Sequence, residues 1–313
     1  MKTHRDFSND LATSSTQEFD YPVDATLMSV TDTQSYVSYA NSAFLDVSGY
    51  SLEDMQGKPH NIVRHPDMPK EAFADLWATL KGGSTWSALV KNRRANGSEH
   101  YWVRANVTPI RSGGDVVGYM SVRTRPESHE TNAAESIYRD FREGRAQRKY
   151  AFHQGLIVRK GLFAWLRIGQ VLPVRWRIRL ALGGMALACI ASVLAGAPTW
   201  ALALTPVLTA LVGTAWLEAR IARPLSQLRR QATDVASGQV APSISPNRVD
   251  EIGMTARAIN QSGLNLRALI GDVATQIQGM QHNNQLALQN NEALKTRTEQ
   301  TSAHLREVTA TAH

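Results

Sequence analysis

Two continuous uncharged stretches divide the chain into three parts. Leu180–Ala197 and Trp200–Leu217 contain no Asp, Glu, Lys or Arg, and each approaches the ~20 apolar residues that cross a bilayer as a helix. Only Pro198 and Thr199 separate them, so the sequence predicts a helical hairpin whose two ends emerge on the same side of a membrane. The alternative is a hairpin buried in a soluble core, where uncharged runs of this length are rare.

Arginines flank this hairpin on both sides, whereas its turn carries no positive charge. Those before it are Arg167, Arg175, Arg177 and Arg179, and those after it are Arg220, Arg223, Arg229 and Arg230. The positive-inside rule therefore predicts that both flanks, and with them both termini of the chain, lie in the cytoplasm.

Ahead of the hairpin, short alternating strands are mixed with capped helices. ATLMSVTD and YVSYA have the pattern of two strands, and Asn41 and Ser51 are suited to cap the helices that follow. Another helix runs from about Pro69 to Lys81, and three longer strands come next, separated by the turn sequences ANG and SGGD. The pattern predicts an α+β domain in which short helices cover one face of an antiparallel five-stranded sheet.

Beyond the hairpin, apolar residues recur at alternating intervals of four and three, the a/d pattern of a coiled coil. The first seam consists of Ile221, Leu225, Leu228, Ala232 and Val235, and the second of Ile252, Ala256, Ile259, Gly263, Leu266 and Ile270. The connector SGQVAPSISPNR separates them, and the second seam continues at Val273, Ile277 and Met280. Two such helices cannot close a four-helix bundle alone, which predicts a homodimer. The alternative is a helical pair packed on the chain's own domains.

Composition narrows the classes of function. Lys+Arg outnumber Asp+Glu 34 to 27, but many of the arginines flank the hairpin without an aromatic stacking platform, so we expect no nucleic-acid partner. The single cysteine, Cys189, rules out an intramolecular disulfide and any CxxC metal motif. No P-loop, GxSxG or metal-binding triad is present, which favours a signal transducer over an enzyme.

The stretches NIVRHPDMPKEAFADLW, VKNRRANG and YWVRANVTPI closely resemble the PAS domain of bacterial aerotaxis receptors, flavin-carrying relatives of the methyl-accepting chemotaxis proteins. The resemblance covers nearly the whole chain, and the RP and DEIG motifs after the hairpin match a HAMP domain. It implies an inner-membrane homodimer that senses redox state or oxygen and signals through the HAMP domain to the chemotaxis histidine kinase and its coupling protein. The resulting boundaries are a flexible tail (1–20), an FAD-binding PAS domain (21–126), a basic linker (127–179), a transmembrane hairpin (180–217), a HAMP domain (218–270) and the start of a signalling coiled coil (271–313).

The same resemblance implies a set of FAD-binding residues. They are Asn41, Arg64, His65, Asp67, Trp77, Trp86 and Asn92. Their chemistry is compatible with that role, because Arg and His suit an anionic group, an Asn amide both donates and accepts hydrogen bonds, and Trp side chains form flat apolar walls. The alternatives are a partly exposed ion pair for Arg64 and Asp67, and ordinary structural packing for His65 and both tryptophans.

The kind of cofactor chemistry is also constrained. A light-oxygen-voltage domain needs a cysteine beside the flavin ring, whereas Cys189 lies in the hairpin, so we expect a redox response. Haem is the rival cofactor, with His60, His65 or His100 as its axial ligand.

The output module of such receptors is not reached before His313, so we expect the sequence to be C-terminally truncated. The family's methylation consensus has only loose echoes, at Glu299-Gln300 and near Glu307. A different class of function stays open, the PAS and HAMP input region of a membrane sensor histidine kinase or cyclase. A third is a membrane scaffold whose PAS domain binds a protein and no cofactor.

Overall fold

The computed structural model describes residues 17–161, 168–238 and 247–311. They divide into two units, one ending at Arg267 and one beginning at Ala268, which are described separately. Most of the predicted N-terminal tail and residues 239–246 of the predicted connector lie outside the described residues.

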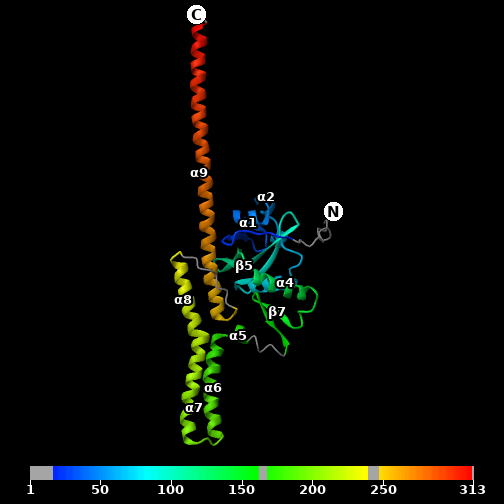
Figure 1. Ribbon diagram of the computed structural model, residues 1–313, viewed down its shortest axis with the longest axis vertical. Helices are drawn as coiled ribbons and strands as arrows, with labels where there is room; N and C mark the ends of the chain where they lie inside the picture. The colour runs from blue at the N-terminus through cyan, green and yellow to red at the C-terminus, as the bar shows by residue number, and fades with distance from the viewer. Residues whose placement is uncertain (1–16, 162–167, 239–246, 312–313) are drawn as a thin grey trace. The chain divides into compact units, whose positions relative to one another are not determined.

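A curled, mainly antiparallel sheet with short helices forms the N-terminal domain of the first unit, and the predicted α+β class is confirmed (Figure 1). Its strands are β1 (Gln17–Glu18), β2 (Leu27–Thr31), β3 (Val37–Ala40), β4 (Trp86–Arg93), β5 (Glu99–Ser112) and β6 (Asp115–Thr124). The order is β1-β5-β6-β2-β3, and β4 pairs with β5. The two-residue strand β1 was not predicted. It pairs in parallel with Glu99 and His100 at the start of β5, whereas β6 pairs with β5 only from Arg104 onward.

Short helices connect β3 to β4, and their ends follow the predicted capping chemistry. They are α1 (Ser42–Ser48), α2 (Leu52–Met55), η1 (His60–Val63) and α3 (Lys70–Lys81). The side chains of Asn41 and Ser51 accept hydrogen bonds from backbone N–H groups in the first turns of α1 and α2. Gly49 ends α1 with φ of 74°, a left-handed conformation that glycine adopts without a steric cost.

The segment expected to be a basic linker contains ordered elements that pack on the sheet domain. They are α4 (Ser128–Arg142), β7 (Tyr150–His153) and β8 (Leu156–Arg159). Ala134 and Tyr138 of α4 belong to the buried core, and Phe152 and Ile157 of the β7–β8 hairpin pack against it. The Tyr138 hydroxyl also donates a hydrogen bond to the Leu89 carbonyl of β4 (2.7 Å).

Two apolar helices form the predicted hairpin and lie side by side (Figure 1). They are α6 (Val174–Leu194) and α7 (Thr199–Leu217). Both stretches are long and apolar enough to cross a membrane, and almost none of their surface is buried within the chain. The exception is Arg177, which is buried.

Polar contacts at the base of the hairpin enclose Arg177. Its guanidinium donates to the carbonyls of Leu172 (3.1 Å) and Gly169 (3.0 Å) and pairs with the Asp250 carboxylate (3.0 Å). Asp250 also pairs with Arg248 and accepts a hydrogen bond from the Gly253 N–H (3.1 Å). The first residue of the DEIG motif, Asp250, thus contacts the start of α6, where Arg177 neutralises its buried charge.

Helical backbone continues from α7 into the next segment through a π-helical turn, η3 (Glu218–Ala222), followed by α8 (Arg223–Ala236). The longest helix, α9 (Glu251–Thr311), starts in the first unit and continues through the second. In the first unit, Leu228 of α8 and Ile252, Ala256 and Leu264 of α9 are buried, whereas Leu266 is exposed. In the second unit, Ile270, Val273, Ile277 and Met280 are exposed at the spacing of the predicted seam.

Candidate functional site

A cavity of about 440 Å³ lies between the sheet and the helices η1 and α3. Its volume falls in the range of about 300 to 1,000 Å³ typical of small-molecule sites. Four of the seven residues expected to bind FAD line it, namely Arg64, Trp77, Trp86 and Asn92. The other three, Asn41, His65 and Asp67, lie outside its lining.

Arg64 and Asn92 are brought together by backbone pairing, because a β-bridge joins the two residues. The Arg64 guanidinium stacks over the Phe73 ring, 4.2 Å from its centroid, and donates to the Met68 carbonyl (3.3 Å). Partial burial lowers the pKa of Arg64. Arg64 makes no ion pair within the described chain, so its charge remains available to an anionic ligand.

Two tryptophans contribute to the walls of the cavity. The Trp77 ring packs edge-on against Tyr119, with centroids 5.4 Å apart. Trp86 is 1% exposed, and its indole N–H donates to the Asp75 carboxylate (2.8 Å). Flat apolar walls with few polar groups suit an aromatic ring system.

Asn41 has a structural position in the fold. Its side-chain oxygen accepts from the Met28 (2.9 Å) and Phe44 (3.1 Å) N–H groups, and its amide donates to the Thr26 carbonyl (2.9 Å). These bonds fasten the start of α1 to β2, so the buried Asn41 shapes the domain around the cavity.

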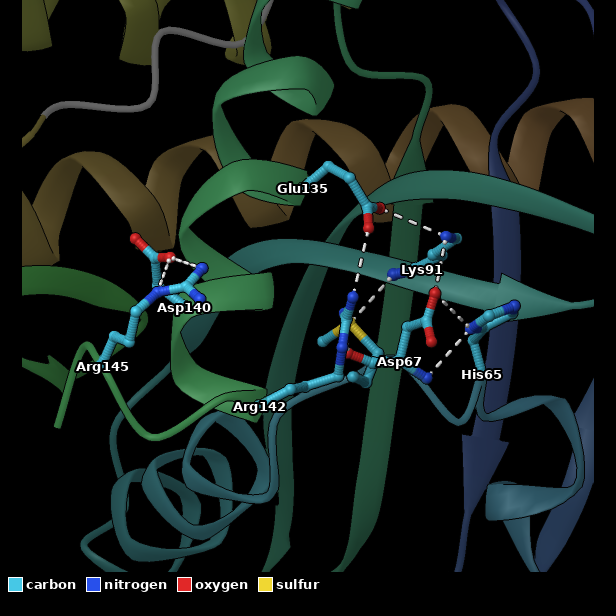
Figure 2. A network of polar contacts seen from close by, with 8 residues as sticks. His65, Asp67, Lys91, Glu135, Asp140, Arg142 and Arg145 are labelled. Carbon is cyan, nitrogen blue, oxygen red and sulfur yellow. Dashed lines mark hydrogen bonds and ion pairs between the residues drawn. The ribbon is translucent and has the colours of Figure 1, made fainter. Parts of the chain in front are cut away.

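His65 and Asp67 lie in a polar network with α4 (Figure 2). The Asp67 N–H donates to His65 Nδ1 (3.0 Å), and Lys91 Nζ contacts both the Asp67 carboxylate (3.0 Å) and the Glu135 carboxylate (3.2 Å). Arg142 donates to the Asp67 carbonyl (2.7 Å). The loop that carries the RHPD motif is therefore tied to both β4 and α4.

The charges in this network follow from burial and from Lys91. Burial lowers the pKa of His65 to about 4, helped by the charge of Lys91, so its imidazole is neutral at pH 7 and Nδ1 accepts the Asp67 N–H. Burial alone raises the pKa of Asp67, but the hydrogen bond and charge of Lys91 outweigh it and hold this pKa below its usual value. Asp67 is thus an anion within the network.

The sequence did not single out Arg123, a buried cation on the cavity wall. Arg123 is 3% exposed, and its Nη2 donates to Ser29 Oγ (3.1 Å) and contacts His60 Nε2 (2.7 Å). The guanidinium also lies over the Phe44 ring, 4.5 Å from its centroid. Its Nη1 is buried without a hydrogen-bond partner among the described residues, and a buried unpaired donor of this kind calls for an acceptor in the cavity.

Burial determines the protonation states of His60 and Arg123. Burial and the charge of Arg123 lower the pKa of His60 to about 3, so the neutral imidazole accepts the Arg123 N–H. Burial lowers the pKa of Arg123 to about 10, which still leaves it charged at pH 7. The cavity therefore contains a fixed positive charge.

The signal for Arg123 was present in the alternation of β6. Tyr119, Ser121 and Arg123 are two residues apart and all three line the cavity. Of the three histidines considered as haem ligands, His60 alone lines the cavity, and its Nε2 is engaged by Arg123. In the described part of the chain, no group of three or more His, Cys, Asp or Glu is placed to hold a metal ion.

Two protein families match segments of the chain. Residues 37–123 match the PAS fold and residues 216–268 match the HAMP domain. A solved light-oxygen-voltage domain studied with a flavin analogue has 22% sequence identity to the chain, covers 37% of it and 87% of its own length, and superposes with a TM-score of 0.33.

Two relatives align with segments of this chain that differ in length. The aerotaxis receptor of Escherichia coli K12 is 48% identical over 265 residues, which cover 83% of this chain and 50% of the receptor. A nitrogen fixation regulatory protein of Klebsiella oxytoca is 28% identical over 97 residues, which cover 31% of this chain and 19% of that protein. The chain thus spans about half the length of the aerotaxis receptor. It contains a PAS domain and a HAMP domain and is homologous to the aerotaxis receptor over 83% of its length.

Proposed function

We propose that the chain is the sensing and transmitting part of a membrane-anchored redox sensor for aerotaxis, with FAD bound in the cavity of the PAS domain. The observation that carries the cofactor assignment is the buried Arg123 guanidinium. Its Nη1 has no acceptor among the residues that the structure describes, and its side chain lines a cavity to which two tryptophans contribute. The similarity to the aerotaxis receptor supports the signalling role.

The cavity residues fit a flavin that changes charge. A bound flavin supplies electron uptake, which adds negative charge to its ring system. Arg123 and Arg64 both line the cavity and would stabilise that charge, because they are cations in a partly desolvated site. Asn92 is buried on β4 and its amide offers both a donor and an acceptor to the cofactor's polar edge.

The proposed role of His65 and Asp67 is to hold the cavity loop in place. Their contacts run to Lys91 on β4 and to the linker helix α4. Asn41 serves the same purpose from the other side, by fixing α1 to β2.

The remainder of the chain provides anchor and relay. The hairpin of α6 and α7 inserts in the bacterial inner membrane with both flanks in the cytoplasm. The α8 and α9 helices form a HAMP bundle with those of a second copy, because one pair leaves apolar seam positions such as Leu225 and Leu266 exposed. Output reaches the chemotaxis histidine kinase and its coupling protein, as in a methyl-accepting receptor.

The test is the visible absorption spectrum of the purified, detergent-solubilised chain before and after dithionite, with chromatography of the released cofactor. Flavin bands that bleach on reduction and release FAD support the proposal. A haem Soret band, or a folded colourless chain purified under conditions that retain flavins, refutes the flavin assignment.

A further inference from the structure

One carboxylate of the sheet domain receives three hydrogen bonds from two different parts of the chain. Asp75 Oδ2 accepts from Trp86 Nε1 (2.8 Å) and from the Gly155 N–H (2.7 Å), and its Oδ1 accepts from the Gln154 N–H (2.8 Å). Trp86 belongs to the cavity wall, whereas Gln154 and Gly155 form the turn of the β7–β8 hairpin. Asp75 therefore joins the cavity wall to the linker.

The turn is shaped for this contact. Gln154 and Gly155 both have positive φ, 50° and 84°, a conformation that directs successive N–H groups toward one anion. A Cβ on Gly155 would lie 2.0 Å from the Ser87 carbonyl oxygen of β4, so only glycine allows the turn to lie this close to the strand. The hairpin is thus seated directly on the strand that begins at Trp86.

The opposite side of the same turn contacts the HAMP region. Arg257 of α9, 5% exposed, donates from Nη1 to the Gln154 carbonyl (2.5 Å). Burial lowers the pKa of Arg257 to about 10, and the nearby Asp75 charge acts in the opposite direction. The Gln154 residue therefore binds Asp75 through its N–H and Arg257 through its carbonyl.

We propose that Asp75 is the coupling residue that passes changes at the cavity wall to the β7–β8 hairpin and through it to α9. The proposal rests on the proposed function, because the cofactor supplies the change at Trp86. Trp86 and Gly155 share the oxygen Oδ2, so a shift of the indole either breaks its bond to Asp75 or displaces the acceptor of the Gly155 N–H. Charge-assisted hydrogen bonds are short and directional, which makes this shared acceptor sensitive to small displacements.

The experiment compares hydrogen exchange of the β7–β8 hairpin, residues 150–159, in oxidised and dithionite-reduced chain held in nanodiscs, with flavin content measured on the same samples. In the native chain we expect the exchange of this segment to change on reduction. Asp75→Asn provides one carbonyl oxygen and an NH₂ group for three N–H donors, so at least one bond is lost. We expect exchange about tenfold faster in both redox states and no remaining redox difference.

The matched control is Asp140→Asn. Asp140 is an exposed aspartate of α4 that pairs with Arg145 and lies outside the three-bond cluster (Figure 2). It should retain native exchange and the native redox difference. Gly155→Ala supplies a second variant that lifts the turn from Ser87 and leaves the Asp75 carboxylate unchanged, and it should reproduce the Asp75→Asn pattern.

The possible outcomes distinguish a failure of the proposed Asp75 coupling, called the relay here, from a failure of the proposed flavin assignment. A flavin-loaded Asp75→Asn chain that keeps the redox difference in hairpin exchange overturns the relay and leaves the proposed cofactor intact. A native chain that carries flavin but shows no redox difference also overturns the relay. A native chain without flavin overturns the proposed function and the relay together, whatever the variants show.

Discussion

At the scale of single residues, the cavity is defined by where positive charge is buried. Arg123 is enclosed by Ser29, His60 and the Phe44 ring, and no carboxylate pairs with it in the described chain. Burying a cation without a counter-charge is costly, and this cost is recovered when an anionic ligand enters the cavity. The residue therefore favours whichever cofactor state has more negative charge.

Replacing Arg123 tests this electrostatic role. Arg123→Gln removes the charge and keeps a polar side chain, so we expect the reduction potential of the bound flavin to fall by on the order of 60 mV, corresponding to a tenfold change for a one-electron couple. Redox titration followed by absorbance measures the shift. Arg111→Gln, at the exposed end of β5, is the control and should leave the potential unchanged. An unaltered potential and flavin content in Arg123→Gln would contradict the role.

His65 makes the stability of the domain depend on pH. Its folded-state pKa of about 4 lies below the ordinary value of 6.5, so between these values the unfolded chain binds a proton that the folded chain does not. Its contribution is complete above about pH 6.5 and is lost as pH falls toward 4. We expect His65 to account for a drop of on the order of 1 to 2 kcal/mol in the free energy of unfolding between pH 7 and about pH 5, in addition to the loss from His60.

Urea unfolding of the chain in nanodiscs at several pH values measures this loss. His65→Asn keeps an acceptor for the Asp67 N–H and should remove the His65 share of the pH dependence, leaving that of His60, whereas His129→Asn, at an exposed position of α4, should leave both shares. Equal slopes in both variants would assign the acid sensitivity to other groups.

The resemblance in sequence identified residues of the cavity but could not assign the neighbours of each side chain. Arg64, Trp77, Trp86 and Asn92 line the cavity, and their role in binding FAD stays a prediction. Asn41, whose polar atoms all bond to backbone, could not be distinguished from a ligand, because the same amide chemistry serves both purposes. Arg123 was missed because a strand arginine is usually solvent-facing, and its inward position depends on sheet register.

At the scale of elements, α4 and the β7–β8 hairpin behave as part of the sheet domain. The resemblance implied a basic linker here. The structure shows that apolar residues of this segment, including Tyr138 and Phe152, pack on the core. Element boundaries set by packing between distant segments are not visible in local composition.

Lys91 is the main polar link between α4 and the sheet. It is buried and pairs with Asp67 and Glu135. Lys91→Met leaves both carboxylates without this partner, so we expect a loss of about 2 to 3 kcal/mol in the free energy of unfolding, reduced from the fully buried case because the carboxylates are partly exposed. Glu135→Gln should cost about 1 kcal/mol.

Urea unfolding monitored by tryptophan fluorescence measures both changes. Glu143→Gln, at an exposed position just beyond α4, is the matched control and should fall within about 0.5 kcal/mol of the native chain. If Lys91→Met were as stable as the control, the network would contribute no net stability to the α4 contact.

At the scale of the whole molecule, the two apolar helices of the hairpin were predicted from the sequence, with one difference in where the first begins. The uncharged run began at Leu180, whereas α6 begins at Val174. Charges mark where a bilayer ends but do not stop a helix, so the helix continues through Arg175 and Arg177. Arg177 then pairs with Asp250, a partner more than seventy residues away in sequence, which no charge count reveals.

The second unit provides the test of self-association. Ile277 lies in an exposed apolar stripe with Val273 and Met280, and such a stripe is stable in water only when a second helix covers it. Ile277→Lys should weaken dimerisation, whereas Gln278→Lys, at the neighbouring exposed position, should not. Chemical cross-linking with a reagent that does not react with cysteine, over a series of protein concentrations, measures the dimer fraction. Equal cross-linking of the two variants would contradict a dimer built on this stripe.

The π-helical turn η3 changes the direction in which the side chains of α8 point relative to those of α7. Relative to an α-helix, a π turn accommodates one additional residue, and one residue corresponds to about 100° of rotation. The face that α8 presents is therefore not a continuation of the exposed apolar face of α7, although the backbone is helical throughout Thr199–Ala236. A regular α-helical turn in place of η3 would therefore rotate the packing surface of α8 relative to α7 by about 100°.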